Sequence, residues 1–286
     1  MPKTAVCVTA LNRPEYTERV IESLEAQPDK DEVDWWLFQG GAVNRYSGLR
    51  HAEDETIERS LAVLMDADLP NKHLRVNDEN IGIALQRDRI FHLLDEEYDR
   101  LIHLEGDIVV GKYWLRLSRK LMDQFPFHIG RMYRLHDPSE HDINPRECLD
   151  EVLITDHGNH VADCITKTVW EEIRDDWHDF VDIIRGYDFP RTEVPREELA
   201  ERFVPGVYGD DHALSHIARK NDVNRVIPRV SRASDIGALG MTHTPENRAG
   251  TARGNEGDLT YEADADIEEF TVYDRAFIRD EDDWRL

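Results

Sequence analysis

The chain has 286 residues and a formal net charge of −25, with 60 acids against 35 bases. Such a surplus repels nucleic acid and anionic membranes, so we expect no nucleic-acid partner and at most peripheral membrane contact. The acids are spread along the whole chain, which is typical of halophile proteins whose self-repulsion is screened at high salt.

Cysteine usage and hydropathy bear on the compartment. Cys7, Cys148 and Cys164 form no CxxC or Cys/His metal pattern, which favours a reducing compartment. Pro2 and Lys3 lead directly into an apolar run, and no apolar stretch approaches the ~18–20 residues that span a bilayer. We therefore expect a cytoplasmic protein without a secretory signal peptide.

Strands and helices alternate in the first part of the chain. Residues 4–10 are a continuous apolar run of the parallel-sheet type, and Pro14 suits the first position of a following helix. Further strands are predicted at 33–38 and 74–76, with helices at 51–64 and from Ile83. This order predicts an α/β fold with a mostly parallel central sheet flanked by helices.

Two acids interrupt the apolar residues at 100–110. Glu105 and Asp107 are separated only by Gly106, directly after a predicted buried strand. Burying an unpaired carboxylate costs several kcal/mol, so these side chains must be exposed, paired or bound to a cation. Ligands of open α/β sheets sit at the carboxyl ends of strands. Two interpretations fit: a divalent metal that holds phosphates, or a turn with two solvated acids.

The second half is less regular. Helices are predicted at 113–125, at 168–184 and from Asp210, and strands at 127–133, 161–165 and 224–227. A loop rich in small residues is expected at 231–240. We place a domain at 1–245 and an acidic tail at 246–286, partly mobile or docked through Phe270, Tyr273 and Phe277.

The order of motifs resembles the GT-A fold glycosyltransferases, specifically the family 2-like nucleotide-sugar transferases. Residues 8–16 resemble that family's first strand, loop and helix, and Asn80-Ile81-Gly82-Ile83-Ala84 resembles its Asn-x-Gly-x-Ala segment. Leu104-Glu105-Gly106-Asp107 resembles the Asp-x-Asp metal motif, with Glu in the first place. Gly209-Asp210-Asp211-His212 resembles the acidic pair that opens a helix, and residues 228–237 resemble a C-terminal loop of the N-acetylglucosaminyltransferase I group. The resemblance covers about residues 4–245.

The resemblance implies a GT-A, Rossmann-like sheet with a smaller mixed acceptor-side half. It also implies a metal-dependent hexosyltransferase that moves a sugar from a nucleotide-diphosphate sugar to a hydroxyl of a glycan, lipid or protein, with inversion. Mn²⁺ or Mg²⁺ would neutralise the leaving diphosphate, and a carboxylate would accept the proton of the acceptor hydroxyl. The implied metal ligands are Asp107, Glu105 and His243. The implied base is Asp211, with Asp210 second. The implied nucleotide-sugar contacts are Thr9, Asn12, Arg13, Gln39, Asn80, Gly82, Arg87 and Glu105.

Simpler interpretations remain open for several of these residues. Asp210 and Asp211 also suit a helix N-terminus, and His243 and Arg87 also suit the surface. The acid that this family usually has after its second strand is replaced by Gln39-Gly40-Gly41, which leaves the nucleotide base undetermined.

Two other functions fit the sequence. One is a nucleotidyltransferase on a similar sheet, although no Gly-rich, Lys-containing phosphate loop is visible near the N-terminus. The other is a non-catalytic GT-A-like domain that binds carbohydrate or protein.

Overall fold

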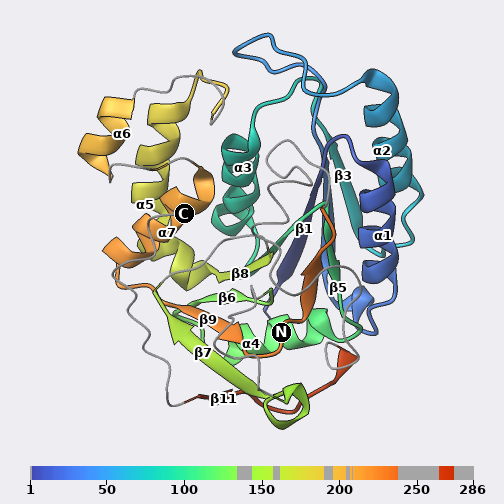
Figure 1. The fold of residues 1–286 in the computed structure, drawn as a ribbon, viewed down its shortest axis with the longest axis vertical. Helices are drawn as coiled ribbons and strands as arrows, with labels where there is room; N and C mark the ends of the chain where they lie inside the picture. Colours follow the sequence, from blue (N-terminus) through green and yellow to red (C-terminus); the bar gives the residue numbers. More distant parts are fainter. Residues whose placement is uncertain are drawn as a thin grey trace.

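The computed structural model describes residues 2–133, 144–156, 162–189, 196–203, 207, 209–237 and 264–273. Within these ranges, a nine-stranded sheet has the order β11-β7-β9-β6-β8-β4-β1-β2-β3, and a separate two-stranded sheet joins β10 to β5 (Figure 1). The strands are β1 (Thr4–Ala10), β2 (Asp34–Gln39), β3 (Lys72–Val76), β4 (Arg100–Glu105), β5 (Ile108–Val110), β6 (Ile129–Arg131), β7 (Glu151–Thr155), β8 (Ala162–Thr166), β9 (Arg225–Pro228), β10 (Ala233–Asp235) and β11 (Thr271–Val272).

The first half of the sheet is all parallel. β1 pairs with β2 on one side and with β4 on the other, and β3 extends the sheet beyond β2. The chain therefore builds outward from β1 in one direction through β3, and then returns to the opposite side of β1 with β4. This reversal makes the carboxyl ends of β1 and β4 the topological switch point, where open α/β sheets bind ligands.

The second half of the sheet is mixed. β8 runs antiparallel to β4 and to β6, β6 and β9 are parallel, and β7 is antiparallel to β9. β7 was not predicted from the sequence. The expectation of an α/β fold with a mostly parallel sheet and a smaller mixed half is confirmed.

Helices cover both faces of the sheet (Figure 1). The reason is visible in β1, where Ala5 and Cys7 face one apolar cluster while Val6 and Val8 face the other, as the two-residue repeat of a strand requires. The first cluster includes side chains of α3 (Ile83–Glu96), α5 (Lys167–Ile184) and α7 (Asp210–Lys220). The second includes side chains of α1 (Pro14–Glu25), α2 (Asp54–Asp66) and α4 (Trp114–Gln124). A short helix, α6 (Arg196–Arg202), packs against α5.

Two predictions from the sequence need correction. The helix expected at 51–64 begins only at Asp54, because residues 42–52 form a turn whose backbone pairs Val43 with Arg50. The loop expected at 231–240 contains strand β10, whose residues pair antiparallel with β5. A three-residue strand is too short to show the two-residue alternation of apolar and polar side chains by which strands are recognised. β10 forms because the edge of β5 offers backbone groups that would otherwise be unpaired.

Part of the acidic tail lies on the domain. Phe270 is buried in the second apolar cluster, and β11 extends the sheet parallel to β7. Tyr273 lies under the guanidinium of Arg229, 3.8 Å from ring centroid to Cζ. Phe277 and most of 246–286 lie outside the described residues, so the boundary at 245 stays a prediction. Among the described helices, none is long and apolar enough to cross a membrane.

Candidate functional site

The site begins at the carboxyl ends of β1 and β4, where Thr9 lies opposite Glu105 in the parallel register. Gly106 follows Glu105, and a Cβ on it would lie 2.5 Å from the Thr9 carbonyl oxygen. Real Cβ contacts are never that short, so only glycine allows the chain to turn here against β1. The turn carries Glu105 and Asp107 out of the sheet on the same edge.

Asp107 is buried where the loop after β1 and residues 235–237 pack closely against it. One carboxylate oxygen, Oδ2, is 2.8 Å from a guanidinium nitrogen of Arg13, which comes from the loop after β1. Gly237 lies on the other side, and a Cβ there would lie 2.3 Å from the same oxygen. Burial raises the pKa of Asp107; Arg13 lowers it, and the charge of Asp235 raises it again.

Asp235 belongs to β10, whose pairing with β5 brings this late segment beside the acids of β4. The Ile236 amide donates to the Asp107 carbonyl at 2.9 Å, and Asp235 Oδ1 accepts from the Gly237 amide at 2.7 Å. Asp235 lies within residues 228–237, whose resemblance to a family loop predicted no role for it. Its contribution depends on the β5–β10 contact, which local patterns do not reveal.

Arg87 joins the β4 acids to the start of α7. Its side chain is fully buried, with one terminal nitrogen 2.8 Å from Asp210 Oδ2 and donating to Asp211 Oδ1 at 2.8 Å. The other terminal nitrogen lies 3.7 Å from Glu105 Oε1. Burial alone would lower the pKa of Arg87, but Asp210 and Asp211 more than compensate and raise it. Arg87 is thus a buried, permanently charged centre between three acids.

The two acids of α7 differ in access to solvent. The Asp210 side chain is 7% exposed, whereas that of Asp211 is 33% exposed. Burial raises the pKa of Asp210 to about 6, against the opposing effect of Arg87, and Asp211 adds to the rise. Burial also raises the pKa of Glu105 well above its usual value, and the charges of Asp211 and Asp107 raise it further. Both acids also suit the positive end of the α7 dipole.

These groups form one cluster in which five carboxyls, those of Glu105, Asp107, Asp210, Asp211 and Asp235, meet the two guanidiniums of Arg13 and Arg87. The raised pKa values of Glu105, Asp107 and Asp210 reflect incomplete compensation by the cations. A hard divalent ion prefers such oxygen ligands. Gly237 leaves the Asp107 carboxylate oxygen uncovered, because a Cβ at that position would collide with it. Asp107 and Glu105 are therefore the residues of this cluster that could hold Mn²⁺ or Mg²⁺, and their role as ligands stays a prediction. His243, the third ligand expected from the resemblance, lies outside the described residues.

The other residues predicted to contact the nucleotide lie near this edge of the sheet, and two of them make hydrogen bonds to the backbone. Asn12 donates to the His51 carbonyl at 3.3 Å, and Gln39, fully buried, donates to the carbonyls of Leu11 and Gly40 at 2.8 and 2.9 Å. Thr9 is half-buried on β1. Their contact with a nucleotide stays a prediction.

The Asn80 segment begins α3 and so positions Arg87. Asn80 Oδ1 accepts from the Gly82 amide at 2.8 Å, and Gly82 has a φ of 80°, which an L side chain rarely adopts. Nearby, Asp188 is buried and accepts from Asn44 and Ser47 while bonding His51. Sequence reasoning missed Asp188, and no motif marks it.

No protein-family model matches the chain, and no curated protein matches it. Among solved structures, it is similar to S. aureus TarS, with 13% identity, a TM-score of 0.47, and coverage of 81% of this chain and 36% of that one. For TarS 1–349 the identity is 12% and the TM-score 0.49, with coverage of 82% of this chain and 61% of that one. For the complex of TarS 1–349 with UDP-GlcNAc the identity is 12% and the TM-score 0.47, with coverage of 81% of this chain and 57% of that one. The chain thus spans less than two thirds of each of these structures.

Proposed function

We propose that this chain is a metal-dependent glycosyltransferase that transfers a hexose from a nucleotide-diphosphate sugar to a hydroxyl acceptor with inversion. One observation carries the proposal: at the switch point of an open α/β sheet, Arg87 joins the one-third-exposed Asp211 to Glu105, and the charge of Asp107 acts on Glu105 in turn. Metal-assisted transfer from a diphosphate needs a proton acceptor and a cation close together, and the nearness of these acids supports the proposal.

Asp211 suits the base because an acceptor can reach it, whereas Asp210 is buried beneath it. The acceptor hydroxyl gives its proton to the Asp211 carboxylate as its oxygen bonds to the anomeric carbon. The bond from that carbon to the diphosphate oxygen breaks with its electron pair, and the nucleoside diphosphate leaves. A single displacement of this kind inverts the anomeric configuration, by analogy with glycoside hydrolysis.

Mn²⁺ or Mg²⁺, held by Asp107 and Glu105, would supply Lewis-acid neutralisation of the leaving diphosphate. Arg87 holds Asp211 in place through its hydrogen bond to Oδ1. Arg13 forms an ion pair with Asp107 and is one-third exposed, so it is available to a donor phosphate at the same edge. We further propose a cytoplasmic location, which the cysteine usage supports, and a high-salt environment, which the −25 net charge supports.

The test measures donor binding and turnover separately. Sugar nucleotides with UDP, GDP or dTDP are expected to raise the melting temperature of the protein only with Mn²⁺ or Mg²⁺ present. One of them should release nucleoside diphosphate, with water as acceptor where no sugar acceptor is supplied. Asp211→Asn should retain the melting shift and lose about 10²–10⁴-fold in turnover. Asp175→Asn, at a side chain 95% exposed on α5, is the matched control.

Three outcomes would contradict the proposal. Release of pyrophosphate would identify a nucleotidyltransferase. Binding of carbohydrate without turnover of any sugar nucleotide would identify a binding domain. Unchanged turnover in Asp211→Asn would remove Asp211 as the base.

A further inference from the structure

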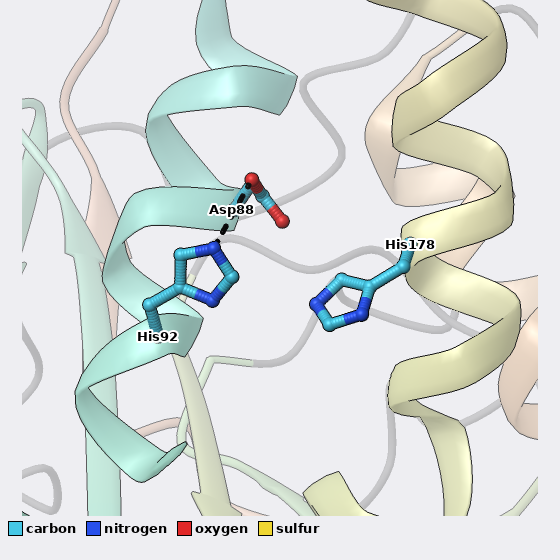
Figure 2. A group of neighbouring side chains, drawn as sticks. All are labelled: Asp88, His92 and His178. Atoms are coloured by element: carbon cyan, nitrogen blue, oxygen red, sulfur yellow. Dashed lines mark ion pairs between the residues drawn. The ribbon is translucent and has the colours of Figure 1, made fainter. Parts of the chain in front are cut away.

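A second group of metal-ligating side chains lies between α3 and α5, outside the acidic cluster. Figure 2 shows Asp88 and His92 on α3 and His178 on α5, pointing toward one another across the space between the two helices. One ligand atom from each of the three lies within 4.8 Å of the others. We propose that Asp88, His92 and His178 bind one divalent transition-metal ion, Zn²⁺ by preference, that joins α3 to α5.

The sequence places the first two ligands on one helix face. Asp88 and His92 are four residues apart, so their side chains are neighbours along α3, and Asp88 Oδ2 lies 3.8 Å from His92 Nε2. Tetrahedral Zn²⁺, with ligand bonds of 2.0–2.2 Å, needs ligand atoms about 3.3 Å apart. His92 is 48% exposed, so a small adjustment of its ring would bring the ligand atoms nearer to that spacing.

Neighbouring side chains already orient the ligands. His92 Nδ1 is 3.3 Å from Asp95 Oδ2, which leaves Nε2 facing Asp88. Trp177 donates its indole N–H to Asp88 Oδ1 at 3.1 Å, which leaves Oδ2 facing His92. A carboxylate on the far nitrogen of a ligating histidine, and a hydrogen bond on the far oxygen of a ligating carboxylate, are the outer partners that metal sites use.

The ring of His178 gives separate evidence for a ligand at this place. Its Nε2 is buried and has no hydrogen-bond partner within the part of the chain that the structure describes. A buried polar atom without a partner costs free energy, so native structures rarely leave one. The ring lies 5.5 Å from that of His92 and 5.6 Å from that of Trp170, and in Figure 2 one of its nitrogens faces the other two residues. A metal ion would satisfy this nitrogen.

The ligand set selects the metal. Two imidazoles and one carboxylate suit Zn²⁺ and its first-row neighbours, whereas the all-oxygen cluster at Asp107 suits Mn²⁺ or Mg²⁺. Asp88 and His92 also line a pocket of about 260 Å³, through which solvent and ions can reach these two ligands. The two proposed metal sites therefore differ in ligand chemistry and in location.

The experiment measures Zn²⁺ binding by the full chain, produced without a histidine tag and stripped with a chelator. Competition against a zinc-sensitive dye should give one tight Zn²⁺ per chain, and Co²⁺ should give the visible absorption of a tetrahedral site. His92→Gln and His178→Gln should each weaken Zn²⁺ binding by about 100-fold or more. His73→Gln, which removes an exposed histidine stacked on Trp36, is the matched control and should bind as the unmodified protein does.

Asp107→Asn separates this site from the one proposed for catalysis, and it should leave Zn²⁺ binding unchanged. Loss of tight Zn²⁺ binding in Asp107→Asn, or its retention in His92→Gln, would overturn the assignment. So would the absence of tight binding in the unmodified chain. Because His92 is half exposed, its variant keeps the test valid even where His178→Gln does not fold.

Discussion

Arg87 offers the sharpest test of the acidic cluster, because one buried cation compensates three acids. In Arg87→Met, a side chain of similar length replaces the guanidinium, and Glu105, Asp210 and Asp211 lose their shared partner. Removing one member of a buried ion pair typically costs about 3–5 kcal/mol, because the remaining charge stays buried and uncompensated. We expect the free energy of unfolding at pH 7 to fall by about that amount.

The dependence on pH distinguishes this cause from a packing defect. The pKa of Asp210 is already raised to about 6, and without Arg87 it rises further. A carboxyl whose pKa is higher in the folded than in the unfolded state lowers the free energy of unfolding at every pH above the unfolded-state pKa of about 3.9. Lowering the pH reduces this destabilisation, because the folded carboxyl takes up a proton and loses its buried charge. The deficit of Arg87→Met relative to the unmodified protein should therefore shrink between pH 7 and pH 5.

Urea unfolding at pH 7, 6 and 5 measures both effects. Arg50→Met is the control: Arg50 pairs with Asp54 at 2.8 Å, but both side chains are about half exposed or more, so its loss should cost less than about 1 kcal/mol at every pH. A loss below 1 kcal/mol for Arg87→Met at pH 7, or a deficit that stays constant from pH 7 to pH 5, would refute the description of Arg87 as the compensating charge.

Three further predictions follow from the site and the charge. Asp107→Asn should abolish the Mn²⁺-dependent rise in melting temperature with sugar nucleotides, and an unchanged rise in differential scanning fluorimetry would place the cation elsewhere. Gly106→Ala should destabilise the protein by about 1–3 kcal/mol in urea unfolding, because the new Cβ meets the Thr9 carbonyl. Gly209→Ala has open space around it and loses only the N-cap preference of α7, so it should cost less than about 1 kcal/mol; equal effects would contradict the close approach. Raising KCl from about 0.1 M to 1 M, at which the Debye length falls from about 10 Å to 3 Å, should raise the melting temperature, since salt screens the −25 net charge; no change would argue against adaptation to high salt.

Local sequence determined the parallel half of the fold and one edge of the site. The apolar run at residues 4–10 predicted β1, and Pro14 predicted the start of the following helix. Both signals are local, because the alternation of side chains along a strand and the fixed φ of proline depend on only a few neighbouring residues. The same local signals placed Glu105 and Asp107 at a strand end. Gly106 is explained by the neighbouring strand, since its missing Cβ leaves room for the β1 backbone.

Only the tertiary structure decided which groups meet. The sequence predicted Arg87 as a nucleotide-sugar contact or a surface arginine. Its burial against Asp211, 124 residues away, depends on where tertiary packing places the start of α7. Asp235 joins the cluster only because β5 has an edge for β10, and His178 faces Asp88 and His92 only because α5 lies against α3. The spacing of apolar residues shows which face of a helix or strand is buried. It does not show which other element covers that face, because this depends on the packing of elements that are distant in sequence. That packing creates both clusters of titratable groups.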